Sequence, residues 1–80
     1  MSFDRMYYTI GQLSKISGLP QSVLRYWETV FDLLTPSKSG GGTRQYSEGD
    51  IKLVLEIKKL LYDEGYTIKG ANKLIKTTFS

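Results

Sequence analysis

The 80-residue sequence predicts a single, mostly α-helical domain in which two pairs of helices flank a β-hairpin. Helix-start and helix-stop signals recur along the chain, and apolar residues repeat at helical intervals between them. Three consecutive glycines, Gly40 to Gly42, interrupt this pattern near the middle, where a helix cannot continue. The predicted order over residues 1–80 is therefore helix, helix, hairpin, helix, helix.

The first two helices are predicted to be joined by a short turn. Thr9 and Gln12 have the spacing of a capping box at the start of a helix over residues 10–17. Gly18 suits a left-handed helix end, and Pro20 suits the first turn of the next helix. Two helices joined in this way form a helix-turn-helix. The apolar residues expected on the buried face of the first helix are Ile10, Leu13 and Ile16.

The second helix, predicted over residues 20–29, divides on a helical wheel into an apolar and a polar side. The residues expected in the core are Val23, Leu24 and Trp27. The residues expected to be exposed are Gln21, Ser22, Arg25 and Tyr26. Arginine and glutamine bind guanine and adenine edges, and serine and tyrosine more often bind phosphates. A polar outer face is also what any solvated helix presents, so this pattern alone leaves both interpretations open.

The segment over residues 33–46 is interpreted as a β-hairpin with short extended arms and a glycine tip. Pro36 and the glycines are incompatible with a helix here. The alternative is a disordered linker over Ser39–Thr43, although neither flank is long enough to form a separate domain.

A third helix is predicted over residues 48–64, from the cap at Ser47 to the stop at Gly65, with Asp50 in its first turn. Its buried face is predicted to comprise Ile51, Val54, Leu55, Ile57, Leu61 and Tyr62. The opposite polar stripe contains the pairs Lys52–Glu56 and Lys59–Asp63. Leu53 and Leu60 lie between the two stripes, either as an extension of the core or as a seam for another helix or subunit.

The last helix is predicted over residues 68–76, with Thr67 as its cap. The residues expected to face inward are Ile68, Ala71, Leu74 and Ile75.

The composition argues against an enzyme, a metal site or a cofactor site. The sequence has no cysteine or histidine, and its eight carboxylates form no acid/base or metal-binding pattern. No apolar run reaches the length of a membrane span and no leader precedes the first helix, which predicts a cytoplasmic protein without a membrane partner. The net charge of +3 is compatible with a polyanionic partner.

Over residues 7–76 the sequence resembles the N-terminal DNA-binding domain of the MerR-type bacterial transcription regulators. The matching runs are Tyr8–Gly18, Val23–Glu28, Leu33–Pro36, Gly42–Ser47, Asp50–Ile51 and Gly65–Ile68. The resemblance implies a winged helix-turn-helix that reads promoter DNA, with the second helix in the major groove and the hairpin, or wing, on the backbone or minor groove. Trp27 replaces the second tyrosine of the family's signature, and the helical wheel assigns it to the core.

The resemblance also implies roles for individual residues. The implied DNA contacts are Gln21, Ser22, Arg25 and Tyr26 on the second helix, Lys38 and Arg44 in the wing, and Tyr66, Thr67 and Lys69 in the turn before the last helix, which forms a second wing in the family. Tyr46 is expected to pack the wing against the body. Thr67 has a competing role as a helix cap, and Tyr66 has a competing place in the core.

For the full-length protein the family implies a homodimer, RNA polymerase as a partner, and a location on the nucleoid in the cytoplasm. Family members continue into a dimerising helix and an effector domain, for which we expect no counterpart in these 80 residues. Two alternatives remain. One is a small excisionase-like protein that bends DNA. The other is a protein-interaction module on the same fold, favoured by the low net charge of +2 over residues 1–46.

Overall fold

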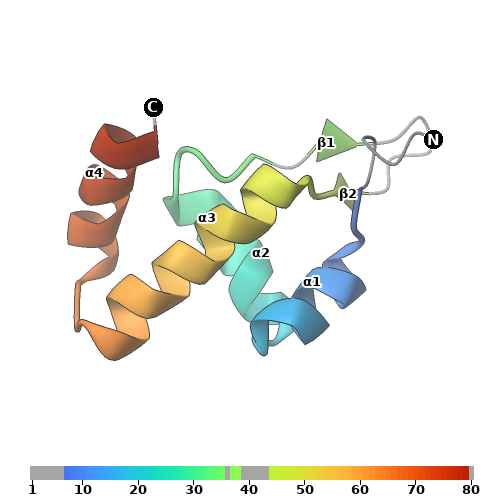
Figure 1. Cartoon of the computed structure of the whole chain (residues 1–80), viewed down its shortest axis with the longest axis horizontal. Helices are drawn as coiled ribbons and strands as arrows, with labels where there is room; N and C mark the ends of the chain where they lie inside the picture. The colour runs from blue at the N-terminus through green and yellow to red at the C-terminus, as the bar shows by residue number, and fades with distance from the viewer. Residues whose placement is uncertain (1–6, 36, 39–43, 80) are drawn as a thin grey trace.

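The computed structural model describes residues 7–35, 37–38 and 44–79, with residues 37, 38 and 44 described by their backbone alone. The predicted order of helices and hairpin is confirmed (Figure 1). The elements are α1 (Ile10–Ser17), α2 (Gln21–Val30), β1 (Ser37–Lys38), β2 (Arg44–Gln45), α3 (Glu48–Lys58), the π-helical turn η2 (Lys59–Asp63) and α4 (Ile68–Phe79). No helix among these residues combines the length and the apolar character needed to cross a membrane.

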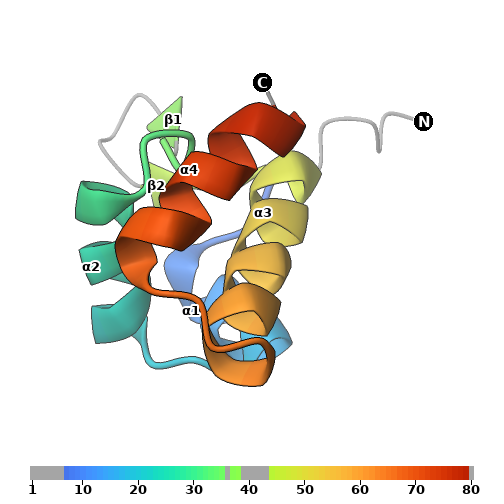
Figure 2. The same cartoon turned by 90° about the vertical axis from the view of Figure 1, so that its left-hand side faces the viewer.

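Helix α2 lies in the middle of the molecule along its longest axis. In Figure 1 the paired strands β1 and β2 lie towards one end of this axis and α4 lies at the other end. Figure 2 looks at the molecule from the α4 end, with α4 in front of α2 and α3. The molecule measures 38 × 25 × 20 Å, so the hairpin and α4 flank α2 on a long, narrow body.

The start of α1 and the turn after it follow the predicted signals. Thr9 and Gln12 form a complete capping box, and Gly18 closes the helix at a φ of 75°. A side chain is strained at this backbone angle, which explains glycine there. The hydroxyl of Ser17 accepts a hydrogen bond of 3.3 Å from the N–H of Leu19, which fixes the turn into α2.

The predicted buried face of α1 is wrong at one position. Ile16 is 47% exposed, and Ser17 is buried instead. Leu13 and Ser17 are four residues apart and lie on one face, whereas Ile16 falls about 100° away from Ser17 around the helix. The core is centred on the side of Leu13 and Ser17, so Ile16 is left at its edge.

One hydrophobic core joins all four helices to the root of the hairpin. Its buried residues are Leu13, Leu19, Leu24, Trp27, Phe31, Leu34, Tyr46, Leu53, Val54, Ile57, Leu60, Ala71 and Ile75. Leu53 and Leu60 are therefore part of the core, as one of the two interpretations of that pair expected. Leu55, at 41% exposure, and Tyr62, at 56%, were wrongly predicted to be buried. Leu55 lies about 200° around α3 from Leu53, on the side away from the core.

The third predicted helix has the expected extent but changes its winding near its end. Ser47 caps α3 in a capping box with Asp50. The last five residues form η2, where the N–H of Glu64 bonds the carbonyl of Lys59, five residues earlier, at 3.0 Å. Gly65, at a φ of 75°, then turns the chain towards α4. This wider winding is that of a π-helix.

Helix α4 begins as predicted and runs further than predicted, to Phe79. The hydroxyl of Thr67 accepts a 3.0 Å hydrogen bond from the N–H of Gly70, which confirms Thr67 as the cap. Ala71 and Ile75 are buried, but Leu74 is exposed, contrary to prediction. Ala71 and Ile75 are four residues apart and share the packed face, which leaves Leu74 at its edge.

The hairpin is antiparallel, with Ser37 opposite Gln45 and Lys38 opposite Arg44. The paired arms agree with the predicted hairpin, and its tip, residues 39–43, lies outside the described residues. A further pairing was not predicted: Tyr8 and Tyr46 exchange two backbone hydrogen bonds of 2.8 Å. The segment before α1 is thereby fixed to the root of the hairpin.

Candidate nucleic-acid interface

The outer surface of α2 presents the four polar residues that the sequence singled out. Gln21, Ser22, Arg25 and Tyr26 are all exposed, whereas Leu24 and Trp27 on the opposite side are buried at 1% and 3% exposure. The burial of Leu24 and Trp27 fixes the rotation of α2 about its axis. The polar side chains are therefore directed away from the body, where base edges and phosphates could be reached.

The start of α2 leaves backbone donors available for an anion. Its first residue follows Pro20, and among the described residues no side chain caps this end of the helix. The first N–H groups of a helix have no partner within it, and the helix dipole makes this end positive. Gln21 and Ser22 therefore combine exposed polar side chains with a helix end that favours phosphate.

Contacts between α1 and α2 and between α1 and α3 hold the helix-turn-helix in place. Gly11 of α1 lies beside the start of α2, since a Cβ atom built at Gly11 would lie 3.6 Å from the Nε2 atom of Gln21, an ordinary van der Waals contact. Lys58 of α3 donates a 2.7 Å hydrogen bond from its Nζ to the carbonyl of Ser17 at the end of α1. A lysine at this end satisfies a free carbonyl and complements the helix dipole. This contact spans 41 residues and was not predicted.

The wing is joined to α2 through Tyr46 and Glu28. The Tyr46 ring is completely buried, and its hydroxyl donates a hydrogen bond to the carboxylate of Glu28. The prediction that Tyr46 packs the wing against the body is thus confirmed. Lys38 and Arg44 occupy facing positions of β1 and β2, but their side chains lie outside the described residues. Their predicted contacts with DNA stay predictions.

Replacing Tyr46 with phenylalanine is expected to destabilise the domain by about 1–3 kcal/mol, because a hydrogen bond to a charged group is lost in a buried place. Urea unfolding followed by circular dichroism measures this change. Tyr62→Phe removes the same atom from a tyrosine that is 56% exposed, and should leave the unfolding midpoint almost unchanged. Equal midpoints for the two variants would contradict the role given to the Tyr46 hydroxyl.

The turn before α4 presents the third group of predicted contacts. Tyr66, Thr67 and Lys69 are all exposed, which rules out the competing placement of Tyr66 in the core. The backbone N–H of Tyr66 donates a 2.9 Å hydrogen bond to the carbonyl of Leu60, so the turn is anchored to η2. Thr67 is both exposed and the helix cap, so the structure is compatible with both of its expected roles.

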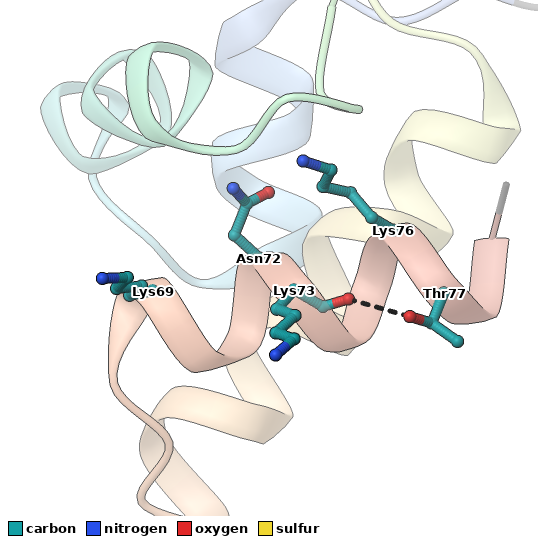
Figure 3. A pocket seen from close by; sticks show the side chains of 5 residues that line it. All are labelled: Lys69, Asn72, Lys73, Lys76 and Thr77. Carbon is teal, nitrogen blue, oxygen red and sulfur yellow. Dashed lines mark hydrogen bonds between the residues drawn. The ribbon is translucent and has the colours of Figure 1, made fainter.

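A polar link joins α4 to the end of α2. The carboxylate of Asp32, just after α2, forms an ion pair with the Nζ atom of Lys76 at 3.0 Å. The backbone N–H of Asp32 donates a 3.2 Å hydrogen bond to the side-chain oxygen of Asn72. Figure 3 shows Asn72 and Lys76 projecting from the same side of α4. Lys76, followed by Asn72, lowers the pKa of the Asp32 carboxyl below its usual value. Sequence reasoning missed this link because 40 and 44 residues separate the partners.

The Asp32 link predicts a small dependence of stability on pH. Because folding lowers this pKa, the ion pair stabilises the folded state above the unfolded-state pKa of about 3.9, and the contribution is lost as the pH falls through the folded-state pKa. A carboxyl titration followed by NMR should show a pKa for Asp32 below about 3.9, and Lys76→Gln should move it back towards that value. An Asp32 pKa that is the same in both proteins would show that the pair does not form in solution.

Comparison with known proteins agrees with this fold. The family model described as "MerR HTH family regulatory protein" matches residues 8–78. The transcriptional repressor CarH of Myxococcus xanthus is 32% identical over 68 residues, which cover 85% of this chain and 22% of CarH. The transcriptional regulator MlrA of Salmonella typhimurium is 30% identical over 73 residues, which cover 91% of this chain and 30% of MlrA. The chain thus spans less than a third of either relative.

Solved structures with the same fold include a MerR family transcriptional regulator from Bacillus thuringiensis, with a TM-score of 0.72 at 29% identity over 91% of this chain and 63% of that one. A second is HiNmlR, described as a MerR family regulator lacking the sensor domain, bound to promoter DNA. Its TM-score is 0.74 at 20% identity over 91% of this chain and 57% of HiNmlR, a likeness that concerns the fold alone. Because the family model covers nearly the whole chain, the chain belongs to the MerR family of helix-turn-helix regulatory proteins and forms their DNA-binding domain.

Proposed function

We propose that this domain binds promoter DNA with α2 in the major groove, with the β1–β2 wing and the turn before α4 on the flanking backbone. The observation that carries the proposal is the division of α2 into a buried apolar side and an exposed side with Gln21, Ser22, Arg25 and Tyr26. Arg25 is the residue of this set that is suited to a two-bond contact with guanine. The uncapped start of α2 adds backbone donors for a phosphate.

In this proposal the chain is the reading part of a larger transcription regulator that acts in the cytoplasm, as a homodimer and together with RNA polymerase. The names of the relatives CarH and MlrA, a repressor and a regulator of transcription, support this reading over the excisionase-like and protein-interaction alternatives. A regulator's reading domain needs no reaction chemistry, and we propose no enzymatic activity.

Binding to a labelled duplex of mixed sequence, followed by fluorescence anisotropy from about 50 to 200 mM salt, tests this function. We expect weak binding, with a Kd of about 10⁻⁴ to 10⁻⁶ M, that falls steeply with salt as counterions are released. A selection for preferred sequences then identifies the site that the domain reads. A folded domain that binds no duplex at the lowest salt would contradict the proposal.

A further inference from the structure

A carboxylate lies in the last turn of the reading helix, where the chemistry of a helix disfavours it. Helix α2 ends at Val30, and its last turn contains Glu28 and no basic residue. The carboxyl end of a helix is negative, so a carboxylate there is repelled rather than attracted. Glu28 is also half-buried, which adds the cost of taking a charge partly out of water. Contacts of Glu28 outside α2 therefore have to offset these costs.

The contact that Glu28 makes outside α2 leads to the root of the wing. The hydroxyl of Tyr46 donates a hydrogen bond to the Glu28 carboxylate, and the Tyr46 ring is completely buried. A hydrogen bond to a charged acceptor is shorter and stronger than one between neutral groups, and it has a set direction. Tyr46 follows β2 directly, so this bond fixes the end of that strand relative to α2.

The backbone of the wing is tied to other segments than α2. The strands β1 and β2 pair with each other, and Tyr46 exchanges its two backbone hydrogen bonds with Tyr8, ahead of α1. The Tyr46 ring also packs in the core, but apolar packing is not directional. The bond to Glu28 is the directional contact that links the wing to the reading helix itself.

We infer that Glu28 is a positioning residue for the wing: through Tyr46 it sets the distance and angle between the wing and α2, so that both reach the same duplex at once. This inference rests on the proposed function and gives a role in DNA binding to a residue that is not itself a predicted contact. Arg25 lies three residues before Glu28, and Arg44 lies two residues before Tyr46. The bond therefore couples the backbone positions of two predicted DNA contacts on different elements.

The test compares two carboxylate variants on two duplexes. The long duplex contains the site found by sequence selection and its flanks, and the short duplex ends, on the side of the wing, at the groove that α2 reads. Glu28→Ala raises the formal net charge by one, and so does the control Glu48→Ala, whose carboxylate is exposed in the first turn of α3. Charge alone would make both variants bind a polyanion more tightly.

We expect the opposite sign for Glu28→Ala on the long duplex, where its Kd should rise roughly tenfold, the effect of one lost DNA contact. On the short duplex it should bind as tightly as wild type or more tightly, because the wing has no backbone to reach there. Glu48→Ala should keep the wild-type ratio of the two affinities. Fluorescence anisotropy measures the four constants at a temperature at which circular dichroism shows every variant to be folded.

Two further variants separate positioning from stability. Glu28→Gln keeps a side-chain oxygen that accepts a hydrogen bond from Tyr46, and it should recover most of the preference for the long duplex. Glu28→Ala leaves the buried Tyr46 hydroxyl without this acceptor, which destabilises the fold. The double variant Glu28→Ala, Tyr46→Phe removes both groups and should lose no more of the preference than Glu28→Ala alone. A purely structural role would lower the affinity for both duplexes by the same factor and leave their ratio unchanged.

An unchanged ratio in folded Glu28→Ala would overturn the inference and leave the proposed function intact. A wild-type domain that binds the long and the short duplex equally would show that the wing does not hold the flanking backbone. That result would remove this inference and the place of the wing in the proposed function, but not the place of α2. A wild-type domain that binds neither duplex at about 50 mM salt would remove the proposed function as a whole.

Discussion

Replacing Trp27 with alanine is expected to destabilise the domain by about 3–5 kcal/mol, the range found when large aromatic side chains are removed from a core. Trp27 is 3% exposed, and its ring packs against Phe31 at a centroid distance of 6.0 Å and against Tyr62 at 6.3 Å. Truncation removes these ring contacts and leaves a cavity in the core. A domain of this size has a total stability of about 4–12 kcal/mol, so the loss is a large part of the whole.

The measurement is thermal unfolding followed by circular dichroism, since the variant contains no tryptophan for fluorescence. A loss of this size should lower the melting temperature by at least about 12 °C, or abolish the transition. Tyr26→Ala is the matched control, because Tyr26 is the neighbouring aromatic residue on the same helix and is 54% exposed. Its effect on stability should stay within about 0.5 kcal/mol. If Trp27→Ala had the same melting temperature as Tyr26→Ala, the Trp27 ring would not belong to the core.

The two variants also separate the faces of α2. Trp27→Ala should reduce DNA binding only as far as it unfolds the domain, whereas Tyr26→Ala should weaken binding in a domain that remains folded. The division of α2 into a structural and a reading side is therefore tested on adjacent residues of the chain.

Features encoded by neighbouring residues could be predicted from the sequence. The helix caps at Thr9 and Ser47 and the helix stops at Gly18 and Gly65 were predicted at or close to the helix ends that the structure has. Each depends on hydrogen bonds or steric limits within about four residues, so the local sequence is enough to determine it. The order of the elements followed directly from these signals.

Burial was predicted less well, because it depends on where the partners of a helix lie. Leu55, Tyr62 and Leu74 are apolar and have helical spacing, yet each lies at the edge of the packed face or beyond it. Leu53 is the opposite case, because it is buried although it lies between the apolar and polar stripes of α3. Its position in the sequence allowed either a core residue or a contact with another helix or subunit, and the fold shows that it belongs to the core. Periodicity defines a broad apolar stripe, and only tertiary packing decides which part of it is covered.

In the candidate interface, too, local features could be predicted and contacts between distant residues could not. The exposure of Gln21, Ser22, Arg25 and Tyr26 followed from the rotation of a single helix, which a helical wheel represents well. The contacts that position α2 relative to its neighbours join residues far apart in sequence, such as Lys58 with Ser17 and Lys76 with Asp32. No local pattern indicates these pairs. A chain with many lysines and carboxylates offers many equivalent pairings until the fold is known.

Replacing Arg25 with alanine is expected to weaken binding to the preferred duplex by about 1–3 kcal/mol, which corresponds to roughly 5- to 150-fold in Kd. Arg25 is exposed on the polar side of α2, close to Trp27, which is buried, and to Glu28, which accepts the hydrogen bond from Tyr46. Its loss should leave the unfolding midpoint within about 0.5 kcal/mol of wild type, because the side chain lies outside the core. Fluorescence anisotropy on the duplex chosen by sequence selection, together with circular dichroism, measures both effects.

Arg25→Lys distinguishes the two ways in which this side chain can bind DNA. Lysine keeps the charge but lacks the planar fork that donates two parallel hydrogen bonds. If Arg25 reads guanine, the lysine variant should keep its salt slope but lose its preference for the selected sequence. If Arg25 holds a phosphate, the lysine variant should bind DNA almost as tightly as wild type. The alanine variant should then bind all sequences more weakly by the same factor, with a salt slope reduced by about 1. Wild-type affinity in the folded alanine variant would remove Arg25 from the DNA interface.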